Sequence, residues 1–200
     1  RGILILVPRN MTKAAGFYNT LMKCNQPAIV VEPLNAYRVK EKMPKNLGEF
    51  CLPVGEIEII KEGNDITIVS YGSTLRIVSF VVDELEKIGI NCELIDLQTL
   101  IPFDQSKRIR ESLSKTNRLL IVDEDLPGGA SSYILQELLK KQDIYNLLDS
   151  PPELLTAKEH RPPYAEDGDY FSKPSKEDVF EKIISIMHEV DPKRYPLAES

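Results

Sequence analysis

The stretch ITIVSYGSTLRIVSFVVDELEKIGINCELIDL, residues 66–97, decides the fold of this chain. It opens with an apolar segment, 66–71, that is typical of a buried strand. A helix is expected to follow through about Ile88 and to stop at Gly89, because glycine commonly takes the left-handed conformation just past a helix. The apolar segment 92–97 predicts the next strand. This order indicates a parallel pair of strands joined by a right-handed crossover.

The same alternation continues on both sides of this stretch. Downstream, Asp104 is expected to cap a helix to Leu113, and Ser175 with Asp178 resembles a capping box. Further elements are expected as an edge strand at 57–60, strands at 118–123 and 154–156, and a helix from Gly129 to about Lys141. The last helix is expected to bury Val179, Phe180, Ile183, Ile184, Met187 and Val190. The pattern predicts an α/β fold with three layers, α/β/α, around a mostly parallel sheet.

A smaller strand–helix–strand unit precedes this region. The runs 3–7 and 28–31 are continuous apolar segments, which predicts strands buried on both faces. A helix to about Cys24 is expected between them, capped by Asn10 or Thr12. Its expected apolar stripe is Ala14, Phe17, Tyr18, Leu21 and Met22.

Proline and glycine divide the chain between these two regions. The segment after the second strand carries Pro33, Pro44, Pro53, Gly48 and Gly55 among scattered charges, with no apolar period. We therefore expect an N-terminal unit at 1–33, a linker at 34–56 and a domain at 57–200. Because Arg1-Gly2 runs straight into an apolar strand with no methionine or leader, we also expect this to be a piece of a longer protein.

Composition excludes several classes of protein. The chain has 42% hydrophobic and 28% charged residues, an ordinary globular balance, and no apolar run long enough to span a membrane. Its net charge of −6 argues against a nucleic-acid partner. The acidity is uneven: residues 1–100 carry 11 basic and 12 acidic side chains, whereas residues 101–200 carry 14 and 19. Three widely spaced cysteines predict reduced thiols and a cytoplasmic location.

Catalytic and metal-binding motifs are weak. Gly72-Ser73-Thr74 opens a helix after a strand, so its amides either hold a phosphate or form a plain helix cap, but no second glycine or Walker lysine follows. His188 is expected to be solvated. His160 lies in a proline-rich loop after a predicted strand, where it either contacts a ligand or partner or is only exposed. The cysteines and histidines lack the spacing of a zinc site. We expect no catalytic, cofactor or metal residue in this chain.

Asp123-Glu124-Asp125, followed by Gly128-Gly129, is the most distinctive polar stretch. Three carboxylates gather where a strand ends, and the glycines let the backbone turn steeply into a helix. The acids either receive a basic partner or neighbouring loop, or serve as helix anions and solvated side chains. Together with His160, these five residues are the candidate interface residues.

The order of segments resembles the C-terminal part of the β subunit of 2-oxoacid dehydrogenase E1 components, the thiamine-diphosphate enzymes that act on pyruvate or branched-chain 2-oxoacids. The resemblance extends from about residue 3 to residue 190. Its most specific motif is Ile-Asp-Leu-Gln-Thr-Leu-Ile-Pro-Phe-Asp at 95–104. The loop 158–164 and the segment 167–174 resemble versions in which α and β parts are fused. The other matching segments are ILVP at 5–8, PAIVVEP at 27–33, DITIVSYG at 65–72, TNRLLIVDE at 116–124 and GG at 128–129.

This resemblance implies a division of labour. Residues 1–33 would end a pyrimidine-binding domain, and residues from about 57 would form a transketolase C-terminal domain. Thiamine diphosphate and its Mg²⁺ would be bound by residues outside this chain, and none is expected here. In some relatives a structural K⁺ is held at positions that match Leu21, Cys24 and Gln26, but no bound metal is expected in this piece.

The implied partners are the rest of E1, a homodimer mate and the subunit-binding domain of the E2 acyltransferase. The whole enzyme would oxidatively decarboxylate a 2-oxoacid and acylate lipoyl-E2, in the mitochondrial matrix if the source is eukaryotic. This chain would contribute assembly and docking and would be inactive alone. The alternatives are a stand-alone α/β dimerisation or docking module, or the C-terminal region of another transketolase-like enzyme.

Overall fold

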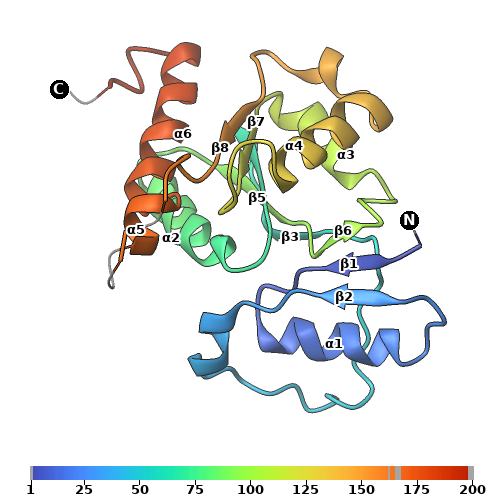
Figure 1. Ribbon diagram of the computed structural model, residues 1–200. Coiled ribbons are helices and arrows are strands. Elements are labelled where there is room, and N and C mark those ends of the chain that lie inside the picture. The colour runs from blue at the N-terminus through green and yellow to red at the C-terminus, as the bar shows by residue number, and fades with distance from the viewer. Residues whose placement is uncertain (1, 162, 165–167, 198–200) are drawn as a thin grey trace.

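The computed structural model describes residues 2–161, 163–164 and 168–197, and Figure 1 shows two sheets that lie against each other. The larger sheet has the strand order β3-β5-β4-β7-β8. Its strands are β3 (Glu58–Lys61), β4 (Ile66–Ser70), β5 (Cys92–Asp96), β7 (Leu119–Val122) and β8 (Glu153–Leu155). β4 pairs in parallel with β5 and β7, and β7 with β8, whereas β3 is an antiparallel edge strand. The expected mostly parallel sheet is therefore confirmed.

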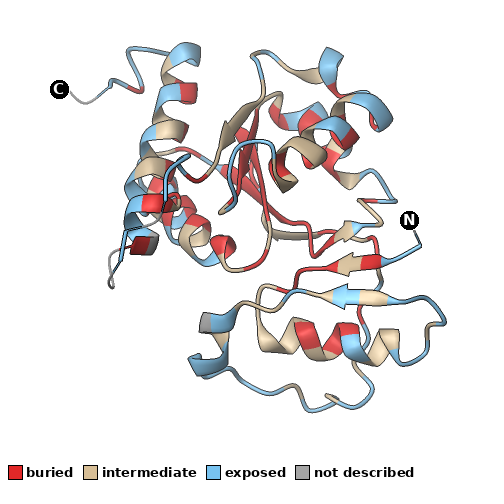
Figure 2. Ribbon diagram, in the orientation of Figure 1, coloured by how far each residue is buried: buried red, intermediate tan, exposed pale blue. Residues whose placement is uncertain are grey.

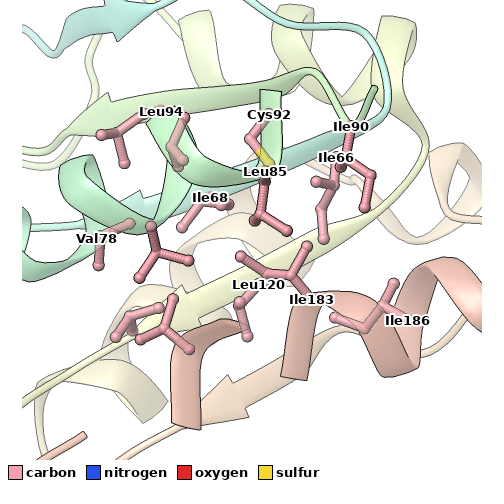
Figure 3. Packing of buried hydrophobic residues seen from close by; sticks show 14 of the residues in the cluster. Ile66, Ile68, Val78, Leu85, Ile90, Cys92, Leu94, Leu120, Ile183 and Ile186 are labelled. Atoms are coloured by element: carbon pink, nitrogen blue, oxygen red, sulfur yellow. The ribbon is translucent and has the colours of Figure 1, made fainter. Parts of the chain in front are cut away.

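Helices cover both faces of the larger sheet, which confirms the three-layer arrangement (Figure 1). One face packs on α2 (Thr74–Lys87) and α6 (Lys176–Val190) through an aliphatic cluster that includes Ile68, Leu85 and Ile183 (Figure 3). The other face packs on α3 (Arg108–Thr116) and α4 (Ala130–Gln136), again through aliphatic side chains. The chain continues from α4 into the π-helical turn η2 (Glu137–Lys141) and the 3₁₀ turn η3 (Tyr145–Leu147). All strand residues of β4, β5 and β7 are buried, as their continuous apolar runs predict.

A second sheet has three strands, two from the N-terminal unit and one from the middle of the chain. Its order is β2 (Ala28–Val30), β1 (Leu4–Leu6) and β6 (Thr99–Ile101), with α1 (Met11–Leu21) as the crossover between β1 and β2. β1 and β2 are parallel, and β6 is antiparallel to β1. β6 lies within residues 57–200, the region expected to be a separate domain, yet it pairs with β1. The boundaries expected at residues 33 and 56 therefore do not separate two independent sheets.

The segment expected to be a linker lies on α1. After the 3₁₀ turn η1 (Leu34–Arg38), the amide of Leu52 donates to the carbonyl oxygen of Gly16 at 3.2 Å. The Asn19 side chain donates to the carbonyl oxygens of Leu47 and Phe50. Phe50 and Leu52 also join the small core beneath β1. The end of this segment is therefore packed structure, although its sequence lacks an apolar period.

Burial differs from the sequence expectation in the N-terminal unit. Tyr18 and Met22, both expected in the apolar stripe of α1, are exposed, and so are Ile29 and Val31. Figure 2 shows β2 in tan and pale blue, whereas the central strands of the larger sheet are red. The predictions that the run 3–7 is buried on both faces and that 28–31 is a buried strand are therefore wrong, because α1 covers only one face of the small sheet and Ile3, Ile29 and Val31 are exposed. Ala14, Phe17 and the half-buried Leu21 do face the core.

Helix boundaries also differ in places. α3 begins at Arg108, three residues later than an N-cap at Asp104 predicts, although Asp104 still accepts from the amides of Arg108 and Ile109 at 3.1 and 2.9 Å. The Ser175 capping box of α6 is confirmed. In α6, Ile186 is buried and Val190 is exposed, since the last turn extends past the sheet. Gly89 has φ +83°, as expected after α2.

The helices within 2–161, 163–164 and 168–197 include none that is both long and apolar enough to cross a membrane. The short helix α5 (Gly168–Ser172), which precedes α6, was not expected from the sequence.

Candidate functional site

The candidate acids lie at the carboxyl end of the larger sheet, where β4 and β7 run side by side. Asp123, directly after β7, is fully buried. Its carboxylate accepts from the hydroxyl of Tyr71 at 2.6 Å and from the amides of Asp125 and Ser131 at 3.0 and 2.8 Å. Burial, with the neighbouring Asp123 carboxylate, raises the pKa of Tyr71 well above its usual range. Asp123 is therefore an internal anchor that fixes the loop before α4, and its carboxylate is not exposed on the surface of this chain.

Glu124 points toward the other side of the same loop. Its carboxylate accepts from the Ser73 hydroxyl at 3.1 Å and from the Lys173 ammonium at 3.0 Å. These contacts link the loop after β7 with the start of α2 and the segment before α6. Ser73 is the N-cap residue of α2, but its hydroxyl donates to Glu124 and makes no cap hydrogen bond; that the amides of residues 72–74 hold a phosphate stays a prediction.

Asp125 is the exposed acid of the three. Its carboxylate accepts from the amide of Leu126 at 2.8 Å, and its carbonyl oxygen accepts from the amide of Ala157. The two glycines differ in what requires them: Gly128 has φ +91°, which favours glycine, whereas a Cβ on Gly129 would lie 2.5 Å from Asp125 Oδ2, so this side chain would have to move. Gly128 and Gly129 thus shape the turn into α4, the structural role expected of them.

The histidines lie apart from this cluster. His160 is exposed, and its Nδ1 lies 2.9 Å from the carbonyl oxygen of the adjacent Arg161. The hydrogen bonds of the described residues do not connect it with Asp123–Asp125. His188 is only half exposed, with Nδ1 2.8 Å from the carbonyl oxygen of Tyr195, so the expectation of a solvated ring is wrong. The chain after α6 folds back on this helix, so that the carbonyl oxygen of Tyr195 lies against the His188 ring.

A cavity of about 830 Å³ opens beside Glu124. It lies between η1, the first turns of α1 and α2, and the segment from α5 to α6. Its charged lining has both signs and comprises Arg9, Glu41, Arg76, Glu124, Lys173, Lys176 and Glu177. Of the residues that line this cavity, Glu124 and the Ser73-Thr74 turn are candidates for a binding role from the sequence alone. The other walls come from positions far apart in the chain, so no local spacing marks them.

The two sheets are joined by an ion cluster near this cavity. Arg9, which follows β1, contacts Glu58 of β3 and lies 2.6 Å from the fully buried Asp96 at the end of β5. Lys13 of α1 pairs with the same Glu58 at 2.8 Å. Burial raises the pKa of Asp96 to about 6, while the hydrogen bond and charge of Arg9 act in the opposite direction. Asp96 is thus a buried acid at the junction of the two sheets, and its pKa is raised toward neutral pH.

Replacing Asp96 by Asn should change how stability depends on pH. The unfolded carboxyl titrates near 3.8 and the native one near 6, so between these values the native state holds more protons than the unfolded state. Wild type should therefore lose stability relative to D96N as the pH rises from 4 to 6, by about 1.4 kcal/mol per pKa unit between the states. Urea titrations of both proteins across this range measure the difference. If the free energy of unfolding of wild type minus that of D96N stays constant or rises from pH 4 to 6, the raised pKa of Asp96 is contradicted.

Among the described residues, no group of three or more His, Cys, Asp or Glu side chains is arranged to hold a metal ion. That thiamine diphosphate is bound by residues outside this chain stays a prediction. At the end of α1, the carbonyl oxygen of Leu21 accepts from the amide of Cys24, and the amide of Gln26 donates to the Cys24 sulfur. No catalytic step is assigned to this chain through thiamine diphosphate or through a metal ion.

Comparison with known proteins places this architecture among α/β domains of thiamine enzymes. Residues 55–179 match the family described as "Transketolase, C-terminal domain". The chain therefore belongs to the transketolase C-terminal domain family, and curated homologues are E1 β subunits of pyruvate and branched-chain 2-oxoacid dehydrogenases.

Two relatives illustrate the match. The chain is 35% identical over 142 residues to the mitochondrial 2-oxoisovalerate dehydrogenase subunit beta 2 of Arabidopsis thaliana, covering 70% of this chain and 39% of that protein. It is 28% identical over 188 residues to the pyruvate dehydrogenase E1 component subunit beta of Rickettsia conorii, covering 94% and 56%. The chain thus spans about half the length of the curated relatives it matches.

A solved structure agrees on the fold. A split-gene transketolase, described as an inactive β4 tetramer, superposes with a TM-score of 0.65 at 19% identity, covering 90% of this chain and 55% of that one. This likeness concerns the fold alone.

Proposed function

We propose that this chain is the C-terminal assembly and docking region of a thiamine-diphosphate-dependent 2-oxoacid dehydrogenase E1. The observation that carries the proposal is the similarity to E1 β subunits, which extends over 94% of the chain for the Rickettsia relative. The whole enzyme would decarboxylate a pyruvate-type or branched-chain 2-oxoacid and transfer the acyl group to lipoyl-E2.

The similarity to E1 β subunits supports a division of labour between this chain and the rest of E1. Bound thiamine diphosphate would supply the electron sink for decarboxylation, and it would be held with Mg²⁺ by the rest of E1. Residues 1–33 would close the pyrimidine-binding domain, residues 34–56 would lead across α1, and residues 57–200 would form the C-terminal domain. The contacts of Arg9 with Asp96 and Glu58 support a fixed relation between the first and last of these parts.

Docking to E2 would use the acidic C-terminal half. Because Asp123 is buried, the candidate acids narrow to the exposed Asp125, to Glu124, whose side chain is 38% exposed beside Lys173, and to other exposed acids of residues 101–200. A basic subunit-binding domain would be attracted by this net charge. We place the protein in the cytoplasm, or in the mitochondrial matrix if its source is eukaryotic, as for the mitochondrial Arabidopsis relative.

A reconstituted reaction tests the function. Full-length protein, with any separate α part, should reduce dichlorophenolindophenol in the presence of thiamine diphosphate, Mg²⁺ and pyruvate or 2-oxoisovalerate. Transfer to lipoyl-E2 should fall at least tenfold when E2 lacks its subunit-binding domain, while dye reduction stays unchanged. Acetoin is the informative alternative substrate, because an acetoin oxidoreductase β subunit from Bacillus subtilis is 29% identical over 191 residues. Turnover of acetoin alone, or of neither substrate class, contradicts the proposal.

Calorimetry on the 200-residue chain provides the control. Titration with thiamine diphosphate and Mg²⁺ should give no heat of specific binding, whereas the full-length protein should bind. Micromolar binding by the 200-residue chain would overturn the division of labour.

A further inference from the structure

The cavity beside Glu124 is bordered by the start of α2. Its lining includes Ser73, Thr74 and Leu75, where this helix of 14 residues begins. The first amides of an α-helix have no acceptor within the helix and carry its positive end. The Ser73 side chain makes no cap hydrogen bond, and the Arg76 amide donates to the carbonyl oxygen of Ser73 at 3.2 Å. Among the described residues, the amides of Thr74 and Leu75 are left without an acceptor.

The Thr74 side chain is an independent sign of a ligand at this position. Thr74 is only 5% exposed and lines the cavity, yet its hydroxyl has no hydrogen-bond partner among the described residues. The unpartnered side-chain atoms that are sealed from solvent belong to Gln98, Ser131, Gln142 and Ser172. Because Thr74 is not one of these, its hydroxyl opens on the cavity. A buried polar group normally has a partner, and here the cavity is the place from which one would come.

The three acids that line the cavity are engaged by other groups. Glu124 holds the Lys173 ammonium at 3.0 Å, and Glu177 accepts from the Tyr170 hydroxyl at 3.2 Å. Glu41 accepts from the first two amides of α1, each at 3.2 Å, and so places an anion at the N-terminus of that helix. In the described part of the chain, no carboxylate accepts from the first amides of α2 in the same way.

Two cations of the lining are in no ion pair among the described residues. The Arg76 guanidinium is exposed and has no hydrogen-bond partner there. Lys176, the first residue of α6, has its ammonium over the Phe80 ring, 3.7 Å from the centroid. A guanidinium and an ammonium in one cavity with free helix amides are the groups that proteins use to bind phosphate. The charge of the lining therefore favours an anion at the start of α2.

The cavity is larger than a phosphate ion requires. Its volume of about 830 Å³ falls in the range of small-molecule sites, about 300–1,000 Å³. Such sites combine a few polar groups with an apolar lining that contacts the organic part of the ligand. The apolar residues of this lining are Pro33, Ala36, Val39, Ile77 and Pro174. The cavity thus has room and surface for an organic group beside the anion.

We propose that this cavity binds a phosphate monoester of a small organic molecule. The phosphate lies at the amides of Thr74 and Leu75, the Thr74 hydroxyl and the Arg76 guanidinium, and the organic group lies against the apolar lining. The proposal does not rest on the 2-oxoacid dehydrogenase function, because it uses only groups of this chain. Its test measures binding and not catalysis, so either proposal can fail alone.

Calorimetric titration of the full-length protein tests the site. Thiamine diphosphate and Mg²⁺ are present in excess, so that any cofactor site for phosphate is already filled. AMP is the probe monoester, inorganic phosphate is the bare anion and adenosine is the uncharged counterpart. We expect AMP to bind, phosphate to bind about tenfold more weakly, and adenosine to give no heat of binding. Absence of binding by both phosphate compounds, or adenosine binding as tight as that of AMP, overturns the proposal.

Two variants assign the binding to the start of α2. Arg76→Gln removes the guanidinium at an exposed position and should weaken AMP binding about tenfold. Thr74→Val removes the hydroxyl, keeps the branched shape and should weaken it about fivefold. Lys87→Gln, at the exposed last residue of the same helix, is the matched control and should change the affinity less than about twofold. If T74V does not fold, R76Q alone decides. AMP affinity in R76Q equal to that of wild type overturns the proposal.

Discussion

Replacing Gly63 by Ala should unfold a large fraction of this protein. Gly63 lies in the turn between β3 and β4, and a Cβ there would press on the backbone of Asn91, Cys92 and Glu93 more closely than any side chain tolerates. Its own amide donates to the Glu93 carboxylate at 3.2 Å. Because both sides of the contact are backbone of the central sheet, neither can move without breaking pairing. We expect a loss of more than about 3 kcal/mol in the free energy of unfolding, measured by urea denaturation.

Gly48→Ala is the matched control for that result. A Cβ on Gly48 would meet no atom within 4 Å, and its backbone is outside the left-handed region. The substitution should therefore change stability by less than about 1 kcal/mol, in the stabilising direction if at all. If G63A and G48A had equal stability, the close approach of the β3–β4 turn to β5 would be disproved.

The second large effect is expected at the candidate site. Asp123→Ala removes a fully buried acceptor from the buried amide of Ser131 and from the partly buried Tyr71 hydroxyl and Asp125 amide. An unsatisfied buried donor costs about 1–3 kcal/mol and a partly buried one less, so we expect a total loss of about 3 kcal/mol. Tyr71 should also titrate at lower pH, because the anchoring carboxylate that raises its pKa is gone.

Asp125→Ala provides the comparison within the same acidic run. Asp125 is exposed and its carboxylate accepts only from the adjacent amide of Leu126 among the hydrogen bonds of the described chain. Its removal should cost less than about 1 kcal/mol. Chemical denaturation and ultraviolet titration of tyrosine follow both variants. A D123A protein as stable as D125A would show that Asp123 is not an internal anchor.

The acidic run shows why sequence reasoning reached the right segment but left its role open. Three consecutive carboxylates after a strand are visible in the sequence, and so are the glycines that follow. Which acid is buried depends on Tyr71, Ser73 and Lys173, all about fifty residues away. Asp123 is buried, Asp125 is exposed, and the Glu124 side chain is still 38% exposed beside Lys173, so the interface reading narrows to Glu124 and Asp125.

The cavity beside Glu124 was not predictable for the same reason. Its walls include Arg9, Glu41 and Lys176, which belong to separate elements and form no motif. The Arg9–Asp96 contact likewise joins residues 87 positions apart. Local spacing carries no information about such pairs.

The sequence by itself determined the α/β layers, the mostly parallel sheet and the family resemblance. This was possible because continuous apolar runs, helix periodicity and the left-handed Gly89 are local consequences of backbone geometry and burial. Tertiary structure alone decided that β6 leaves the C-terminal domain to pair with β1, and that Ile29 lies bare on a half-covered sheet. Burial on a given face depends on which distant segment packs there, and a strand's own residues do not specify that neighbour.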